Sequence, residues 1–447
     1  MGRAVGVAMV SDFFYPSKGG VEMHVYQLSQ CLMKRGFRVI VITHARGPYR
    51  GVQWMPNGLK VYYLHYRDVV DNVILPTVFM TLPAVRHILL REHIDIVHSH
   101  QATSPLGHEC LIHARTLSMY NRYSHDTLGD GGSEPHEYRI VYTDHSLFGF
   151  ADVAGIHINK VRGRVRVRVI SLLLSDVDHA ICVSHTNREN LTLRSGIPPR
   201  RIAVIPNAVD AHRFSPDPSM RPPPPRVNIV VISRLTYRKG IDLLVDVIPA
   251  ICEQFPNVHF IIGGDGGKRT ILEEMREEHR LIDRVEMLGA VPHSQVRDIL
   301  RRGHIFLNSS LTEAFCIAII EAAACGLLVV STRVGGVPEV LPEDMMRLAE
   351  PNAASIVGVL GEAIHRAPNI DAFEHNRQIL GMYCWHDIAE RTEAVYRRVL
   401  GRRPRSFASR VRLYKSLGAY SGTLVVFLLL VNYLLLNVLE WCRPRRK

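Results

Sequence analysis

The sequence predicts an α/β protein in which two Rossmann-like domains face each other across a cleft and a transmembrane helix follows at the C-terminus. Short apolar runs alternate with amphipathic segments in both halves of the chain, which is typical of parallel strands joined by crossover helices. A proline-dense stretch separates the halves, and a long uncharged run precedes the C-terminus. With 447 residues, the chain is long enough for two domains, each with its own core.

The first half of the chain, residues 1–210, is predicted to form the N-terminal Rossmann-like domain. Its apolar runs are short and lie between segments of helical periodicity, which favours parallel strands. The expected strands are Val5–Val10, Val39–Thr43, Val61–Leu64, Ile94–His98, Ile140–Tyr142, Ala180–Val183 and Ala203–Ile205. Between Ser118 and Arg139 the composition turns polar, so we expect a surface insertion there.

A proline-dense linker, residues 211–226, is expected to separate this domain from the second one. Its four consecutive prolines exclude both a helix and a central strand. Residues 227–383 are then predicted to form the C-terminal Rossmann-like domain. Its expected strands are Val227–Ile232, Val258–Ile262, Val285–Leu288, Ile305–Leu307 and Leu328–Ser331, and its expected helices are Gly240–Gln254, Arg269–Arg280 and Ser294–Arg302. Residues 384–400 are predicted to form a helix that returns across the two domains.

The C-terminal tail carries a clear physical signal. Residues 401–416 form a basic juxtamembrane segment, residues 417–439 contain no charged residue, and residues 440–447 form a basic tail. About 20 helical residues cross the ~30 Å hydrocarbon core of a bilayer, so residues 417–439 are predicted to span a membrane, with a buried core helix as the alternative. Six basic residues before this run, against four after it, favour a cytosolic location for the large N-terminal part.

Charge and cysteine content disfavour other classes of protein. Ten Lys or Arg residues and one Glu lie between Arg402 and Lys447, so the tail carries +9 of the net charge of +12, and nucleic acid is not expected as a partner. The eight cysteines show no C-x-x-C spacing, which favours reduced thiols in the cytosol. The apolar run Ala4–Val10 is too short for a signal peptide, so we expect a first strand there.

Two glutamates eight positions apart, Glu313 and Glu321, mark the strongest candidate site. We expect a polar turn at Asn308–Thr312 and a helix over Ala314–Ala324. The N-terminus of such a helix favours an anion, and ligands of open α/β sheets collect at the carboxyl ends of strands. On one helix the two carboxylates would lie roughly 80° apart, near enough to address one ligand. The alternative is helix capping by Thr312 and Glu313, with Glu321 as a solvated residue.

Two cations open the second domain, in the stretch I-S-R-L-T-Y-R-K-G. Arg234 follows the first predicted strand and Lys239 precedes the first predicted helix, so together they could hold a diphosphate without a metal ion. Structural ion pairing is the alternative. Glycine pairs that include Gly264 end the next strand, where the backbone must turn tightly or approach a ligand closely.

The first domain offers a glycine loop and several histidines. Gly19 and Gly20 precede a helix that is predicted to begin near Val21, but their loop lacks the G-x-G-x-x-G spacing of dinucleotide-binding enzymes, so a nicotinamide cofactor is disfavoured. His145 ends a strand at the predicted cleft edge, and His98 and His100 end a neighbouring strand; packed histidines are the alternative. The stretch Asp176–Asp178 has the D-x-D form but precedes a strand, so we interpret it as a turn and expect no metal.

Arginines alternate with glycine or valine in a stretch that has the period of a strand and is also compatible with a basic helix. These residues are Arg162, Arg164, Arg166 and Arg168. An exposed, solvated face is one interpretation. The other is a surface attracted to anionic lipid headgroups, where each basic residue contributes about 1 kcal/mol.

Six stretches of the sequence together resemble one known family. They are S-D-F-F-Y-P-S-K-G-G-V-E, T-D-H-S-L-F-G-F-A-D, I-P-N-A-V-D, S-R-L-T-Y-R-K-G-I-D-L-L, L-N-S-S-L-T-E-A-F-C-I-A-I-I-E-A-A and S-T-R-V-G-G-V-P-E-V-L-P. The E-x7-E spacing resembles that of the retaining glycosyltransferases with the GT-B fold. All six stretches resemble the catalytic subunits of phosphatidylinositol N-acetylglucosaminyltransferase, and the resemblance covers nearly the whole chain, including the tail.

The resemblance implies a role for each matching residue. Glu313 would face the donor sugar and Glu321 would hold the ribose, while Arg234 and Lys239 would clamp the diphosphate. His145 would contact the donor or acceptor region. The expected catalytic residues are therefore Glu313, His145, Lys239 and Arg234, and the expected donor-binding residues are Gly20, Gly264, Arg234, Lys239, Ala314, Phe315, Glu313 and Glu321. The acceptor or membrane surface is expected to involve His100, Arg162, Arg164, Arg166 and Arg168.

The resemblance also implies the reaction. It is the transfer of N-acetylglucosamine from UDP-N-acetylglucosamine to phosphatidylinositol, the first step of GPI-anchor synthesis, with retention of configuration and without a metal ion or cofactor. The first domain would be the acceptor side and the second would bind the donor. The expected location is the endoplasmic reticulum membrane, spanned once, with cytosolic catalytic domains and further subunits as partners. Alternatives are another membrane-bound GT-B transferase with a different sugar nucleotide or a polyprenyl acceptor, and an inactive membrane-anchored binding subunit.

Overall fold

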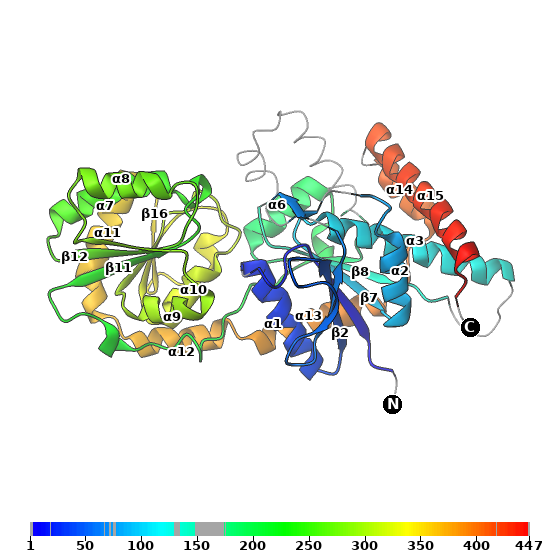
Figure 1. Cartoon of the computed structure of the whole chain (residues 1–447), viewed down its shortest axis with the longest axis horizontal. Helices are drawn as coiled ribbons and strands as arrows, with labels where there is room; N and C mark the ends of the chain where they lie inside the picture. The colour runs from blue at the N-terminus through cyan, green and yellow to red at the C-terminus, as the bar shows by residue number, and fades with distance from the viewer. Residues whose placement is uncertain are drawn as a thin grey trace. The chain divides into compact units, whose positions relative to one another are not determined.

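The computed structural model divides the chain into two compact units (Figure 1). Unit 1 consists of Met1–Val183, Asn187–Ile205 and Ala389–Lys447, and unit 2 consists of Ser184–Thr186 and Pro206–Ile388. The structure describes residues 3–17, 19–66, 68–70, 73–74, 77–128, 135–147, 174, 176–416 and 418–445. The chain therefore enters unit 2 twice, first at Ser184–Thr186 and again at Pro206, and it returns to unit 1 for the last time within helix α13, Trp385–Leu400.

Unit 1 is built on an eight-stranded sheet with the strand order β10-β9-β8-β7-β1-β2-β4-β3. The strands are β1 Gly6–Val10, β2 Arg38–His44, β3 Gly51–Trp54, β4 Lys60–Leu64, β7 Ile96–His100, β8 Arg139–Asp144, β9 His179–Cys182 and β10 Ile202–Val204. Neighbouring strands are parallel except β3 and β4, so the seven predicted strands and their parallel pairing are confirmed. The sequence did not predict β3, because this edge strand is mostly exposed and lacks an apolar run.

The helices of unit 1 are α1 Gly20–Lys34, α2 Leu82–Arg91, α3 Pro105–Leu128, α6 His185–Ser195, α13, α14 Phe407–Ser416 and α15 Ala419–Cys442. Helix α3 packs on the sheet, whereas α15 packs on α2, α3 and α14. A separate short hairpin pairs β5, Asp68–Val70, with β6, Val73–Ile74. Buried residues of β1, β7, β8, α2 and α3 form one apolar core, to which Leu436 of α15 also belongs.

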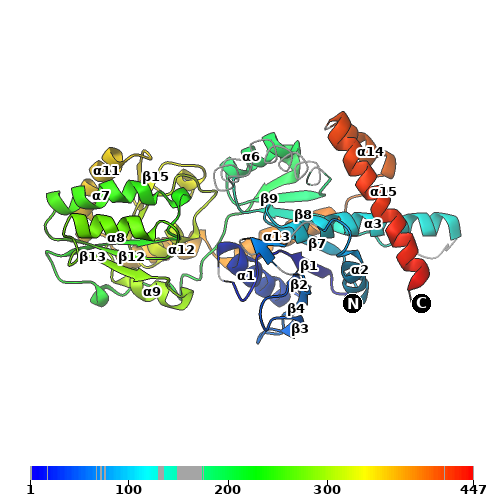
Figure 2. The same ribbon diagram turned by 45° about the horizontal axis from the view of Figure 1, so that its top comes forward.

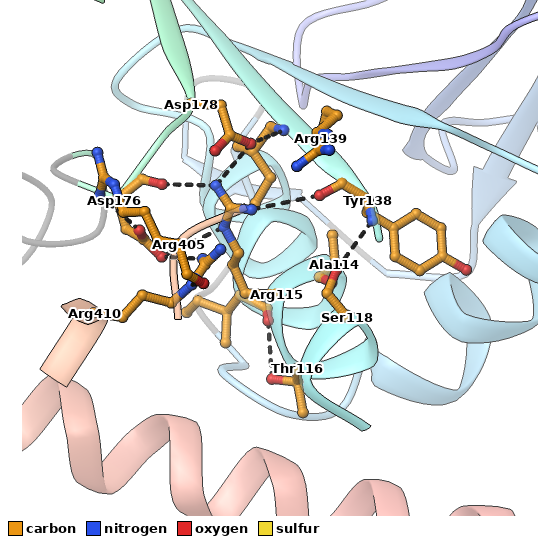
Figure 3. Close-up of polar contacts among 12 residues, drawn as sticks. Ala114, Arg115, Thr116, Ser118, Tyr138, Arg139, Asp176, Asp178, Arg405 and Arg410 are labelled. Carbon is orange, nitrogen blue, oxygen red and sulfur yellow. Dashed lines mark hydrogen bonds and ion pairs between the residues drawn. The ribbon is translucent and has the colours of Figure 1, made fainter. Parts of the chain in front are cut away.

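The expected surface insertion after Ser118 is wrong as far as residue 128, because α3 continues through this segment. Ser118 is buried: its hydroxyl donates to the Ala114 carbonyl at 2.9 Å and accepts from the Tyr138 amide at 3.0 Å (Figure 3). Thr116 accepts a hydrogen bond from Asn432 of α15 at 2.7 Å. These polar residues are thus satisfied inside the unit, while residues 129–134 lie outside the described part of the chain.

The uncharged C-terminal run forms α15, in which Gly422–Cys442 is long and apolar enough to cross a membrane. One face of this helix packs on α2, α3 and α14. There Glu440 accepts two hydrogen bonds from the buried Arg86 guanidinium, at 2.9 and 2.6 Å. The opposite face is exposed along the helix and apolar, with Phe427, Leu434 and Val438 among its residues.

The D-x-D stretch lies in a turn, as expected, and its carboxylates hold a buried cluster of arginines (Figure 3). Arg115 of α3 contacts Asp178 at 2.9 Å and Asp176 at 3.4 Å. From the C-terminal segment, Arg405 and Arg410 approach the two oxygens of Asp176 at 2.9 and 2.7 Å. The nearby Arg115 lowers the pKa of Asp178 although burial alone would raise it. This ion-pair cluster ties residues 405–410 to the interior of unit 1.

Unit 2 contains a parallel six-stranded sheet with the order β13-β12-β11-β14-β15-β16. Its strands are β11 Val227–Ile232, β12 Val258–Gly263, β13 Val285–Gly289, β14 Ile305–Asn308, β15 Leu328–Thr332 and β16 Met346–Ala349. Its helices are α7 Ile241–Gln254, α8 Arg269–Glu278, α9 His293–Arg301, α10 Ile317–Ala324, α11 Ala353–Arg366 and α12 Ala372–Met382. Helices α7, α8 and α11 cover one face, and α9, α10 and α12 cover the other (Figures 1 and 2). This is the predicted Rossmann-like layering.

Candidate functional site

The carboxyl ends of β11 and β14, which are neighbours in the sheet of unit 2, bring together two of the predicted residues. Lys239 ends a single 3-10 turn, Tyr237–Lys239, that follows β11, and Glu313 lies in the loop that follows β14. The Lys239 ammonium forms an ion pair with Glu313 Oε1, and both side chains are only partly exposed. Ser310 Oγ lies 2.9 Å from the same carboxylate oxygen. The sheet thus presents a cation and a carboxylate at one edge, where α/β folds bind their ligands.

Lys239 keeps its charge in this environment. Burial alone would lower the pKa of the ammonium, but the Glu313 carboxylate outweighs burial and raises that pKa above its ordinary value. The nearby Arg234 guanidinium opposes this effect more weakly, and its own side chain is exposed. A paired and an exposed cation therefore act on each other at this site, and two such cations can hold an anionic group without a metal ion.

The expected helix start at Ala314 is wrong, since α10 begins at Ile317. Cys316 has a φ of 71°, and this left-handed conformation prevents the right-handed helix from extending back to Glu313. Glu313 consequently lies in a loop and not on the helix, so the predicted helical angle between the two glutamates does not apply. The loop is held by hydrogen bonds from the Gly336 amide to the Glu313 carbonyl, at 3.0 Å, and from the Leu311 amide to the Arg238 carbonyl, at 2.9 Å.

Ala314 and Phe315 are nearly fully buried in this loop. The Phe315 ring packs edge-on against Tyr383 with their ring centroids 5.6 Å apart. Burial raises the pKa of the Cys316 thiol to about 12, and the Glu313 carboxylate acts in the same direction, so the thiol stays protonated. These side chains support the loop. The ionic groups of the site are those of Lys239 and Glu313.

Glu321 lies on α10 and is mostly buried. Its Oε1 lies 3.0 Å from Nε2 of His293, the first residue of α9. The His293 ring also meets Phe214 edge-on, with their centroids 5.9 Å apart. Sequence reasoning missed His293, because nothing in the stretch V-P-H-S-Q indicates that this histidine reaches a glutamate 28 positions later.

Two glycines make close backbone approaches around this site. Gly240, at the start of α7, has a φ of 66°, and a Cβ there would lie 1.8 Å from the Ser309 carbonyl oxygen. Gly264, after β12, has a φ of 143°, and a Cβ there would lie 1.8 Å from the Ser233 carbonyl oxygen. Only glycine fits both positions. The predicted close approach at Gly264 is therefore an approach of the chain to itself.

We expect the Gly264→Ala variant to lower the free energy of unfolding of unit 2 by about 2 kcal/mol, because the added Cβ meets backbone and the φ is strained. Thermal unfolding of the full chain in detergent measures this loss. Gly267→Ala is the matched control, since a Cβ at this position of the same loop meets nothing within 4 Å. Equal stability of the two variants would contradict the proposed close approach.

The predicted residues of unit 1 lie at the carboxyl ends of its strands. Gly20 is the exposed first residue of α1. His100 ends β7 and is fully buried, and the half-buried His145 follows β8. With His24 of α1 they form a group in which one ring nitrogen of each residue lies within 4.8 Å of the corresponding nitrogens of the other two. The predicted residues Arg162, Arg164, Arg166 and Arg168 lie outside the described part of the chain.

Two family models match the chain. "Glycosyl transferases group 1" matches residues 219–371, which include the Lys239 and Glu313 site. "PIGA (GPI anchor biosynthesis)" matches residues 44–129 in unit 1.

Curated relatives match nearly the whole chain. A phosphatidylinositol N-acetylglucosaminyltransferase subunit of Arabidopsis thaliana is 53% identical over 98% of this chain and 92% of the relative. The human protein of the same name is 46% identical over 99% of this chain and 86% of the relative. The phosphatidylinositol N-acetylglucosaminyltransferase gpi3 subunit of Schizosaccharomyces pombe is 46% identical over 98% and 90%.

Solved structures of low sequence identity share the fold. Sucrose-phosphate synthase from Thermosynechococcus elongatus superposes with a TM-score of 0.68 at 19% identity, over 89% of this chain and 99% of that one. HepE from Anabaena in complex with UDP and glucose superposes with a TM-score of 0.64 at 16% identity, over 88% and 99%. These likenesses show the fold alone, and they confirm the predicted GT-B class.

Proposed function

Because this chain belongs to the PIGA family of phosphatidylinositol N-acetylglucosaminyltransferase subunits, we propose that it transfers N-acetylglucosamine from UDP-N-acetylglucosamine to phosphatidylinositol. The chain is a glycosyltransferase with the GT-B fold. Transfer to phosphatidylinositol is the first step of GPI-anchor biosynthesis. The observation that carries the proposal is the Lys239–Glu313 ion pair at the carboxyl ends of β11 and β14, inside the part that matches the group 1 glycosyltransferases.

In this proposal the donor is held by unit 2. Lys239 and Arg234 contact the diphosphate, where negative charge grows as the sugar leaves. Glu313 faces the sugar, and Glu321, oriented by its contact with His293, holds the ribose hydroxyls. Gly20 of unit 1 is proposed to lie near the transferred group.

The reaction retains configuration at the anomeric carbon. The bond from this carbon to the diphosphate oxygen breaks, and a bond to an inositol hydroxyl oxygen forms on the same face. The leaving phosphate oxygen accepts the hydroxyl proton, so no carboxylate has to act as a base. We therefore assign Glu313 to positioning and electrostatics, in keeping with its ion pair to Lys239. Neither a metal ion nor a cofactor is required for this chemistry.

Membrane attachment is proposed to occur through α15, with the protein in the endoplasmic reticulum membrane and both units in the cytosol. The length and mean hydropathy of Gly422–Cys442 support a single crossing. A crossing helix would have to release the contact between Glu440 and Arg86, so spanning requires an arrangement in which this face of α15 is free. Further subunits of a transferase complex are proposed partners, since the relatives are named as subunits.

The proposal is tested with membranes that contain the full chain and its companion subunits. Radiolabelled UDP-N-acetylglucosamine is supplied together with either phosphatidylinositol or a polyprenyl phosphate. We expect label in phosphatidylinositol, with unlabelled UDP-N-acetylglucosamine but not UDP-glucose competing. Label in the polyprenyl lipid alone would favour a related membrane-bound GT-B transferase. Absence of label from both lipids, with the protein folded, would favour an inactive binding subunit.

A further inference from the structure

Four histidines of unit 1, among them the proposed site residue His145, have their rings in contact. The rings of His98 and His100 on β7 have centroids 4.2 Å apart, and those of His100 and His145 lie 5.5 Å apart and nearly parallel. His24 of α1 meets His145 edge-on at 4.6 Å. A neutral histidine carries its proton on one of two ring nitrogens. The hydrogen bonds that it makes with a neighbouring ring determine which nitrogen that is.

The contacts of His100 define where its proton lies. Its Nε2 lies 3.4 Å from the sulfur of Met9 on β1. A thioether sulfur accepts hydrogen bonds and cannot donate them, so this contact is a hydrogen bond only when Nε2 carries the hydrogen. Burial first, and the neighbouring histidines second, lower the pKa of His100 well below its usual value, so the ring is neutral and has a single N–H. Nδ1 of His100 therefore has a free lone pair.

The lone pair on His100 Nδ1 determines which nitrogen of His145 carries the proton. His100 Nδ1 lies 3.2 Å from His145 Nε2. Since His100 Nδ1 can only accept, His145 Nε2 must donate, and burial likewise keeps His145 neutral by lowering its pKa. A neutral ring with its hydrogen on Nε2 has an unprotonated Nδ1. His145 thus presents a hydrogen-bond acceptor.

We propose that His100 is a positioning residue that holds His145 in the tautomer protonated on Nε2, so that His145 Nδ1 accepts a hydrogen bond from a substrate hydroxyl. The partner must be a donor, which excludes an ionised phosphate oxygen and leaves a hydroxyl of the donor sugar or of the inositol ring. This inference rests on the proposed function and adds to it the chemical class of the group that His145 recognises. It also gives the buried His100 a role that does not require contact with substrate.

The first test is a double-mutant cycle measured as the kcat and KM of sugar transfer. We expect His145→Ala and His100→Leu each to lower kcat by about 10-fold, in the range of one lost hydrogen bond to a reacting complex, and the two together to cost no more than either alone. His100→Asn keeps an acceptor oxygen for His145 and is expected to retain most of the activity. If the two losses multiply, or if His100→Asn is as impaired as His100→Leu, the positioning role is overturned.

His98→Gln is the matched control for packing. His98 is equally buried, but its nitrogens lie 2.7 Å from the Tyr396 hydroxyl and 2.7 Å from Thr143 Oγ1, and neither belongs to His145. We expect this variant to lose stability without losing its sensitivity to His145→Ala. A loss of that sensitivity in His98→Gln would contradict a specific action of His100.

The second test reads the tautomer without turnover, so it remains decisive if the proposed function fails. In the full chain labelled with ¹⁵N-histidine, the signals that disappear in His145→Ala report the two His145 nitrogens. We expect a protonated Nε2 and an unprotonated Nδ1 in the wild type and a mixture in His100→Leu. A protonated Nδ1 in the wild type would overturn the proposal. So would a stoichiometric bound metal ion, because His24, His100 and His145 would then act as its ligands.

Deoxy analogues locate the partner hydroxyl. An analogue that lacks this hydroxyl should be transferred at a rate insensitive to His145→Ala. Insensitivity with a deoxy-sugar donor places the partner on the donor, and insensitivity with a deoxy-inositol lipid places it on the acceptor. Sensitivity that persists with every singly deoxygenated analogue would overturn the proposal.

Discussion

The Lys239→Ala variant is expected to transfer sugar about 10²–10³-fold more slowly than the wild type, the usual effect of removing one preorganised charge from a developing anion. The structure holds this ammonium charged beside Glu313, because the carboxylate raises the pKa of Lys239. Of the two cations proposed to contact the diphosphate, this variant keeps the exposed Arg234. The measurement is kcat in membranes that contain equal amounts of folded protein.

Two variants control for effects of charge and stability in this experiment. Lys239→Ala combined with Glu313→Gln removes the unpaired carboxylate without restoring the cation, so its transfer should stay slow. Arg302→Ala removes a cation that pairs with Glu286, at the opposite end of the strands, and should leave transfer unchanged. Undiminished turnover of folded Lys239→Ala would remove this residue from the catalytic set.

The sequence predicted the parts of the fold and site that depend on local pattern. The predicted strands of both sheets are apolar runs, and Lys239 and Glu313 each follow a strand end, so parallel pairing alone brings them to one edge. Prediction from the sequence failed where the start of a helix depends on a single backbone angle. The left-handed φ of Cys316 moves the helix start by three residues, and a cysteine gives no sign of such a conformation.

Long-range contacts were also beyond sequence reasoning. Ser118 and Thr116 look like surface residues, because their partners Tyr138 and Asn432 are supplied by distant parts of the chain. The contact of Glu321 with His293 has the same origin. From sequence alone a polar side chain is expected to be exposed. Its burial can be predicted only when its hydrogen-bond partner in the interior is known.

The Asp176→Ala variant is expected to lower the free energy of unfolding of unit 1 by about 3–5 kcal/mol, because it leaves buried guanidinium groups without their partner. Asp176 accepts hydrogen bonds from Arg410 at 2.7 Å, Arg405 at 2.9 Å and the Tyr414 hydroxyl at 2.8 Å. Thermal unfolding of the full chain in detergent should show a fall in Tm on the order of 10 °C.

The matched control for this stability effect is Glu189→Ala, which removes an exposed carboxylate from the same unit. We expect its Tm to stay within about 1 °C of the wild type, as for most surface changes. The Asp176→Ala variant should also release α14, so a protease site introduced near Phe407 should become more accessible. An unchanged Tm and unchanged cleavage would contradict the role of the ion-pair cluster as the tie between α14 and unit 1.

In the proposed function, the Lys239–Glu313 site of this chain transfers N-acetylglucosamine to phosphatidylinositol. The most direct test follows label from UDP-N-acetylglucosamine into phosphatidylinositol in membranes whose only member of this family is the wild-type chain or its Lys239→Ala variant. We expect a labelled N-acetylglucosaminyl lipid, in α configuration, with the wild type and little or none with the variant. Equal labelling by both chains, or a product in β configuration, would contradict it.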